Sequence, residues 1–176
     1  MTLNNIVEEL LSLTDSQSIH YIRPGDIVLL SGSGWTDRTI NRITQSIYSH
    51  AAGVIKPYEV IDILPFKKTG YKKLNQYTGR VDIFTCDLLT DTQRNIIIEY
   101  VNKKAGVSYD YFLLFWQASR YLLHWSWNYK KSRRIICSTL WAEAYREVEV
   151  ELCPGIKYPS PGDLANSTLL RRVLSY

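Results

Sequence analysis

Apolar residues recur at helical spacing in the N-terminal quarter of the chain. Between residues 3 and 11 leucine, isoleucine and valine return every three or four positions, which predicts a helix within the lead-in over residues 1–22. A second helix is predicted to begin with Thr36 or Asp37 as its cap and to run through Ile47, with isoleucines along one stripe. The chain therefore begins with helical segments on either side of a short apolar run.

Short apolar runs bounded by turn residues predict the strands. They are IVLL after a Pro-Gly-Asp turn, SHAAGVI and YEVIDIL on either side of Lys56-Pro57, and VDIFTC after Gly79. The two middle runs are close enough in sequence to form a hairpin. The lysine-rich stretch that ends at Gly79 is predicted to be a loop, because it has no apolar periodicity.

The second half of the chain is predicted to be mainly helical. Thr90 and Gln93 have capping-box spacing and open a helix that ends near Gly106. The tail over 158–173 is predicted to be mostly irregular. Because helices and strands are mixed and the strands are neighbours in sequence, we expect one α+β domain over residues 1–176, with a small antiparallel sheet packed against helices.

The segment 111–127 is the most aromatic part of the chain. Gln117, Arg120 and His124 interrupt it, so it does not have the pattern of a membrane span. A buried or half-buried helix is the first interpretation. An apolar lid or surface that meets lipid or an acyl chain is the alternative.

Composition narrows the class of protein. The chain has 176 residues, 45% hydrophobic and 22% charged, which is ordinary for a globular domain large enough to bury a core. The net charge is +4, and basic clusters such as Lys67-Lys68 are typical of solvated loops, with contact to phosphates or anionic lipid as the alternative. No nucleic-acid motif accompanies these clusters, so nucleic acid is not an expected partner.

The N-terminal segment and the cysteines indicate a cytoplasmic setting. The segment has no basic start, and Glu8 and Glu9 lie within its apolar run, which is not typical of a secretory signal peptide. Three irregularly spaced cysteines do not make a disulfide framework, and no pair has the spacing of a zinc site. We therefore expect no metal and no cofactor.

Cys137 is the candidate nucleophile. It is predicted to lie in the first turn of an amphipathic helix, beside Arg133 and Arg134, where the helix dipole and the positive charges favour a thiolate. A buried structural thiol is the alternative, since cysteine is commonly buried. Cys86 and Cys153 have no comparable setting and are expected to be structural.

His50 is the candidate base for that thiol. It opens an apolar strand whose next residues are small, which would let a helix approach closely. A satisfied core histidine is the alternative. Such a pair usually needs a third polar group to orient the imidazole. Glu59 and Asp62 point to opposite faces of the next strand, and Asp62 is favoured because its apolar neighbours make an unpaired carboxylate expensive.

Together these residues resemble the permuted NlpC/P60 cysteine hydrolases, in the papain-like branch of the YiiX-like and YebB-like proteins. The matching segments, in chain order over roughly residues 23–168, are RPGDIVLL, SHAAGVI, VIDI, GVSYDY, ICSTLWAEAY and SPGDLANS. Each is similar to a family segment: the PGDI strand, the histidine strand, a strand with a glutamate, a G-x-x-Y-D-Y segment, the cysteine helix and a T-P-G-D-L-A-x-S tail. In papain itself the cysteine precedes the histidine, so the order is reversed.

The resemblance implies a circularly permuted papain-like fold with Cys137 as nucleophile and His50 as general base. Asp62 falls where the family usually has glutamate, and Thr139 falls where the family has glutamate after the Cys-Ser pair. Residues 107–134 would be an aromatic helical insertion. By position, Tyr109 and Ser138 are candidate substrate-binding residues. A bacterial or phage origin is also implied.

Three functions remain open at this point. The first is an amidase or peptidase that cleaves an amide through a Cys137 acyl-enzyme, on a peptide or peptidoglycan fragment. The second is a lipid acyl hydrolase, acyltransferase or thioesterase in which residues 111–127 receive the acyl chain, with peripheral membrane contact. The third is an inactive relative that only binds. The oligomeric state is not indicated by the sequence.

Overall fold

The computed structural model describes residues 22–32, 34–63, 69–107 and 136–176. The predicted N-terminal helix and the aromatic segment 111–127 lie outside the described residues. The described elements are β1 (Ile27–Ser31), α2 (Trp35–Thr44), β2 (His50–Lys56), β3 (Glu59–Asp62), β4 (Gly70–Lys73), the 3-10 turn η2 (Leu74–Gln76), β5 (Arg80–Thr85), α3 (Asp91–Lys103), α5 (Cys137–Arg146), α6 (Pro161–Ala165) and β6 (Arg171–Ser175).

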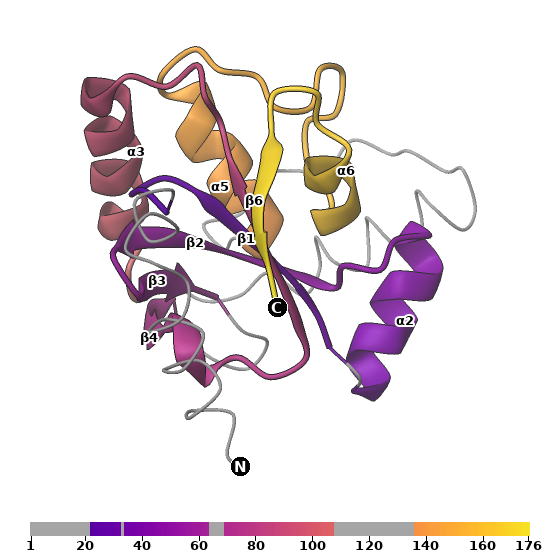
Figure 1. Ribbon diagram of the computed structural model, residues 1–176. Helices are drawn as coiled ribbons and strands as arrows, with labels where there is room; N and C mark the ends of the chain where they lie inside the picture. Colours follow the sequence, from indigo (N-terminus) through magenta and orange to yellow (C-terminus); the bar gives the residue numbers. More distant parts are fainter. Residues whose placement is uncertain (1–21, 33, 64–68, 108–135) are drawn as a thin grey trace.

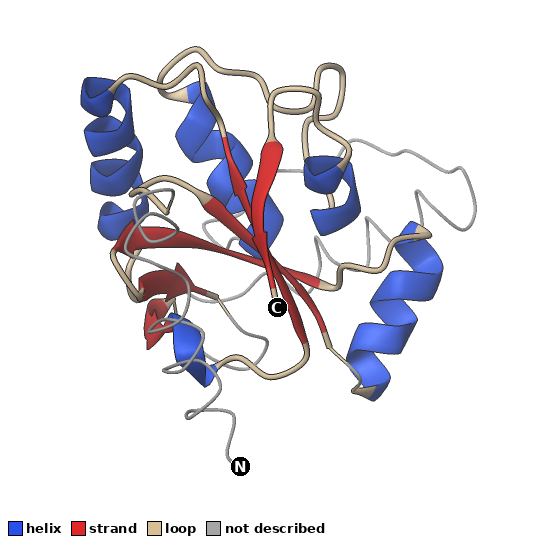
Figure 2. Cartoon of the chain, viewed as in Figure 1, coloured by secondary structure: helices blue, strands red, loops and turns tan. Residues whose placement is uncertain are grey.

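The strands form one six-stranded sheet in the order β4-β3-β2-β1-β5-β6. Every neighbouring pair runs antiparallel. Figure 2 shows this sheet crossing the middle of the molecule with helices beside it. The prediction of an α+β domain on an antiparallel sheet is therefore confirmed for the described residues.

Alternation along the strands divides the core between the two faces of the sheet. Ile27 and Leu29 of β1 belong to the cluster that includes the apolar residues of α3 and α5, whereas Val28 and Leu30 belong to a second cluster on the other face. Figure 1 shows α3 and α5 side by side against the sheet. Helix α5, which begins at Cys137, thus packs against one face of the sheet.

Local signals explain where α3 begins and correct the bounds of α2. The Gln93 N–H donates to the Thr90 hydroxyl at 3.2 Å, and the Thr90 N–H donates to the Gln93 side chain at 3.0 Å, so the predicted capping box is confirmed.

The prediction for α2 was wrong at both ends. Gly34 is its N-cap, Asp37 accepts from the Gly34 N–H at 3.1 Å, and the helix ends at Thr44 before a left-handed Gln45 rather than at Ile47.

Two segments predicted to be irregular contain regular structure. The lysine-rich stretch forms β4, which pairs with β3, and then η2. The tail forms α6, whose cap Ser160 accepts from the Asp163 N–H at 3.1 Å, and β6, which pairs with β5. Both were missed because polar edge strands and five-residue helices carry too few apolar positions to show a period.

Arg94 of α3 is buried and ties the turn before β1 to the end of β5. Its guanidinium donates to the Asp26 carboxylate at 2.9 Å and to the Pro24 carbonyl at 2.8 Å. It also donates to the Thr85 hydroxyl at 3.2 Å and to the Cys86 carbonyl at 2.9 Å. Because Asp26 is fully buried, this pairing is what lets a charged carboxylate remain inside the fold.

Gly53 of β2 is the point where α5 comes closest to the sheet. A Cβ added there would lie 2.2 Å from the Trp141 ring, and Trp141 is itself fully buried. The indole therefore rests on the bare backbone of β2. This contact fixes the height of α5 above the strand that begins with His50.

Gly53→Ala is expected to destabilise the protein by about 1–3 kcal/mol, because the new methyl group forces the Trp141 ring out of its site. The free energy of unfolding in urea measures the loss. The matched control is the double variant with Trp141→Phe, whose smaller ring leaves room for the methyl group. Strictly additive losses in that cycle would contradict the contact.

Candidate active site

Three side chains from three separate elements meet at one end of the β2–β3 hairpin. His50 is the first residue of β2, Asp62 is the last of β3, and Cys137 is the first of α5. The His50 Nε2 atom lies 2.5 Å from the Asp62 Oδ1 atom. The Cys137 thiol is hydrogen-bonded to the same imidazole. The structure thus brings together the three residues predicted from the sequence.

The position of the sulfur depends on where the β2–β3 ladder ends. The last registered pair toward this end is Gly53 with Ile61, so Ala51 lies beyond it. Its backbone N–H hydrogen-bonds to the Cys137 sulfur. A donor that regular pairing would assign to β3 therefore supports the negative charge of a thiolate.

The second carboxylate oxygen of Asp62 is also occupied. The Tyr77 hydroxyl, which follows η2, donates to Asp62 Oδ2 at 2.6 Å. Tyr77 is buried, and the Lys72 ammonium lies 3.8 Å from the centre of its ring. Asp62 is therefore held by a donor on each oxygen and cannot turn away from His50 without losing one of them.

Electrostatics favour an ion pair between the thiol and the imidazole. Burial acts to lower the pKa of His50, but the Cys137 thiolate and the Asp62 carboxylate outweigh burial and raise that pKa to about 10. Burial acts to raise the pKa of Cys137, yet the His50 imidazolium and the Ala51 N–H bring the pKa below its usual value. Both shifts favour the pair of thiolate and imidazolium, and the thiolate is the reactive form of cysteine.

Asp62 itself stays ionised in this arrangement. Burial acts to raise its pKa, but the charge of His50, the hydrogen bonds from His50 and Tyr77 and the charge of Lys72 lower it below the usual range. A buried carboxylate with these partners is a stable counter-ion for an imidazolium. It also fixes the ring so that Nδ1 is the nitrogen left for the sulfur.

The other predicted site residues lie elsewhere or outside the described residues. Glu59, the alternative to Asp62, is at the far end of β3, where the Lys56 ammonium lies 3.7 Å from its carboxylate. Ser138 is fully buried, and its hydroxyl donates to the Pro159 carbonyl at 2.6 Å, so it ties α5 to the segment before α6. Tyr109 falls outside the described residues.

Tyr77 was missed by sequence reasoning. It lies in the lysine-rich stretch that was predicted to be a loop. One sequence signal was available: Leu74 and Tyr77 are apolar residues three positions apart in a polar segment, a spacing that indicates a helical turn with one buried side. Both are buried in the cluster on the face of the sheet opposite α5.

Cys86 and Cys153 do not share this setting. Cys86 is fully buried, and all three cysteines are free thiols. Burial, together with the charges of Asp163 and Glu151, raises the pKa of Cys153 to about 12. Cys153 is 5% exposed, as is Cys137, so the two thiols differ in electrostatic surroundings rather than in burial.

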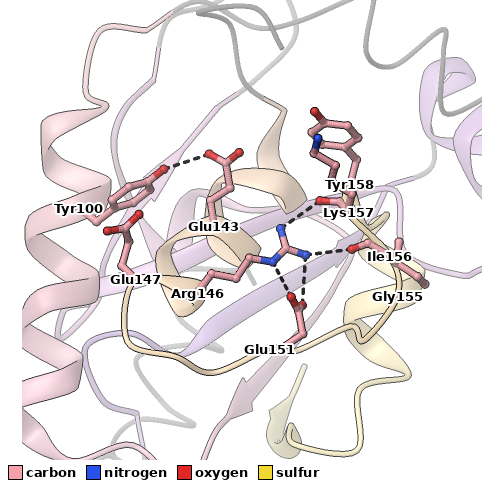
Figure 3. Close-up of a pocket in the computed structure, with 9 residues that line it drawn as sticks. All are labelled: Tyr100, Glu143, Arg146, Glu147, Glu151, Gly155, Ile156, Lys157 and Tyr158. Carbon is pink, nitrogen blue, oxygen red and sulfur yellow. Dashed lines mark hydrogen bonds and ion pairs between the residues drawn. The ribbon is translucent and has the colours of Figure 1, made fainter. Parts of the chain in front are cut away.

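A hollow of about 560 Å³ lies at the other end of α5 (Figure 3). It is lined by glutamates, tyrosines and Arg146. The Arg146 guanidinium donates to Glu151 at 2.6 Å and to the carbonyl of Ile156 at 2.9 Å, so its charge is paired with the Glu151 carboxylate. The hollow therefore lies beside a turn that Arg146 stabilises at the C-terminal end of α5, and it is not part of the Cys137 site.

No helix among residues 22–32, 34–63, 69–107 and 136–176 is both long and apolar enough to cross a membrane.

No protein-family model matches the chain, and no curated protein matches it in sequence. Among solved structures, it is similar to the crystal structure of the metalloprotein YiiX from Escherichia coli O157:H7. The TM-score is 0.66 at 16% identity, over 88% of this chain and 98% of the YiiX chain. The chain has a YiiX-like fold.

Proposed function

We propose that the protein is a cysteine hydrolase that cleaves an amide bond through a Cys137 acyl-enzyme. The observation that carries the proposal is the hydrogen-bonded series Asp62–His50–Cys137, which combines an oriented imidazole with a thiol of lowered pKa. The order histidine before cysteine, together with the YiiX-like fold, supports assignment to the circularly permuted papain-like NlpC/P60 hydrolases.

The proposed chemistry uses only groups of the chain and water. The Cys137 thiolate attacks the carbonyl carbon of the amide, and the developing oxyanion accepts hydrogen bonds from backbone N–H groups in the first turn of α5. Those N–H groups have no partner within the helix, and Ile136, as the N-cap, offers no side-chain acceptor. The His50 imidazolium then gives its proton to the leaving amine as the C–N bond breaks.

Hydrolysis of the acyl-enzyme returns the site to its starting state. His50, now neutral, takes a proton from water as the water oxygen attacks the thioester carbonyl. The C–S bond breaks, the acid product leaves, and the thiolate and imidazolium are restored. Asp62 stabilises the imidazolium in both halves of the cycle.

The site does not fit a metal ion, although YiiX is described as a metalloprotein. The imidazole of His50 is engaged by Asp62 and by Cys137. Within the part of the chain that the structure describes, no group of three or more His, Cys, Asp or Glu side chains is placed to hold a metal. No step proposed here therefore uses a metal.

Cys137 is expected to react with iodoacetamide at pH 7 about 10- to 100-fold faster than Cys153 in the folded protein, because the pKa of Cys137 lies below its usual value and that of Cys153 is raised to about 12. Peptide mass spectrometry gives the rate at each cysteine. Cys153 is the matched control, since its exposure equals that of Cys137. Equal rates for the two would remove the basis for a nucleophile.

The bond cleaved is tested separately with chromogenic amides, acyl esters and thioesters, using Cys137→Ala as the blank. Turnover of amides that disappears in Cys137→Ala supports the proposal. Turnover confined to long-chain esters or thioesters would select the acyl alternative, which depends on residues 111–127. A reactive Cys137 that turns over no substrate of either class would leave the protein as a binding relative.

A further inference from the structure

We propose that Tyr77, with Lys72 above its ring, is a positioning residue that keeps the proton of the His50–Asp62 hydrogen bond on His50. This inference rests on the proposed function and adds an outer layer to the same site. It assigns a role to the segment 70–77, which forms an edge strand and a 3-10 turn beside β3 (Figure 1).

The need for such a residue follows from the surroundings of Asp62. The carboxylate is 4% exposed, and its hydrogen bond to His50 is short, at 2.5 Å. In so dry a site, a carboxylate without other donors would become a better base and would compete with the imidazole for this proton. If the proton moved to Asp62, the sulfur would face a neutral imidazole.

The Tyr77 hydroxyl counters that transfer. It donates to Asp62 Oδ2 at 2.6 Å and so stabilises the ionised carboxylate. Burial and the adjacent Asp62 raise the pKa of Tyr77, so the phenol keeps its own proton and remains a donor at any working pH. Without this hydroxyl, a buried oxygen of Asp62 would have no hydrogen-bond donor. Protonation of Asp62 would then remove the cost of burying that unpaired charge.

Lys72 strengthens the same effect from the outside. Its ammonium lies 3.8 Å from the centre of the Tyr77 ring, where it draws electron density from the phenol and makes the hydroxyl a better donor. The register of β4 places Lys72 opposite Val60, two residues from Asp62. The charges therefore alternate along the series: Lys72 positive, Asp62 negative, His50 positive and Cys137 negative.

Tyr77→Phe is the direct test, because it removes one oxygen and keeps the ring. The rate of Cys137 alkylation is measured from pH 4 to pH 9 in the folded protein. We expect the acid limb to move to higher pH and the rate at pH 6 to fall about fivefold to tenfold, since the sulfur loses part of its imidazolium partner. Lys72→Met is expected to shift the limb in the same direction by less.

Tyr48→Phe is the matched control. Tyr48 is also 6% exposed, and its hydroxyl also donates to a buried carboxylate, that of Asp82 at 2.5 Å. Asp82 makes no contact with His50 among the described interactions. Tyr48→Phe is therefore expected to lose a comparable amount of thermal stability and to keep the wild-type pH profile.

Each outcome bears on the inference. A Tyr77→Phe profile that superimposes on the wild-type profile overturns it, as does an equal shift in Tyr48→Phe, which would mark a general structural effect. If Tyr77→Phe does not fold, an unchanged profile in Lys72→Met overturns it instead. A wild-type Cys137 no more reactive than Cys153 would contradict the proposed function itself, and that result is read before either variant is made.

Discussion

His50→Ala is expected to slow alkylation of Cys137 at pH 6 by about 10- to 100-fold. The imidazolium is the main group that offsets the cost of burying the thiolate, because burial by itself raises the pKa of Cys137. With that charge gone, the thiol has a pKa above its usual value. At pH 6 only a very small fraction of it is then ionised.

The pH dependence separates this effect from a change in access to the sulfur. In the wild type, the thiolate is already present below the usual thiol pKa, and His50 keeps its proton up to a pKa of about 10. Alkylation therefore reaches its plateau at lower pH than in the variant. In His50→Ala the rate climbs about tenfold per pH unit through the neutral range, as for any thiol below its pKa.

The same pKa values set the expected range for catalysis. Hydrolysis needs the thiolate and the protonated imidazole together, so activity falls on the acid side as Cys137 gains a proton. On the alkaline side it falls as His50 loses its proton near pH 10. Alkylation needs only the thiolate and does not fall on the alkaline side.

Two controls keep the result interpretable. His50→Gln can still hydrogen-bond to Asp62 but carries no charge, so it tests the imidazolium without leaving a bare carboxylate in the core. Cys153 in the same protein reports any general loosening of the fold. A rate at Cys137 within threefold of wild type in both variants would mean that His50 does not activate the thiol.

Arg94→Met is expected to cost about 3–5 kcal/mol of stability, the largest loss of any single change considered, because it leaves the Asp26 carboxylate buried without its cation. For a domain of this size that loss corresponds to a fall in Tm of about 6–20 °C. Thermal unfolding followed by circular dichroism measures it. Arg171→Met is the control, because the Arg171 ion pair with Asp87 is exposed and is worth about 0–1 kcal/mol.

The loss in Arg94→Met should also depend on pH. Burial raises the pKa of Asp26, and removing Arg94 takes away groups that act to lower it. Asp26 in the folded variant then binds a proton more tightly than it does in the unfolded chain. The stability lost relative to wild type is therefore largest at neutral pH, and it becomes smaller as the pH falls through the folded-state pKa of Asp26. A deficit that grows toward acid would contradict this account.

The sequence was informative wherever a local rule acted alone. Thr90 and Gln93 predicted the start of α3 because a capping box needs only its own four residues. The choice of Asp62 over Glu59 followed from strand alternation and from the cost of an unpaired carboxylate between isoleucines. His50 was predicted as a strand start and Cys137 as a helix start, and the structure has both elements beginning at these residues.

What could not be predicted depends on contacts between distant segments. Nothing local to Tyr77 indicates that η2 will place its hydroxyl against Asp62, since that contact requires β4 to pair with β3. The Ala51 N–H is available to the sulfur only because the β2–β3 register ends at Gly53. α6 carried a readable Ser160–Asp163 cap, but its five residues were too short to show a helical stripe.

The three groups of the site come from β2, β3 and α5, and the nucleophile joins last along the chain. The His50 imidazolium and the Ala51 N–H, which lower the pKa of this sulfur, both belong to β2 and reach it only when α5 packs on the sheet. The lowered pKa of Cys137 is therefore expected to appear only once α5 has packed against β2.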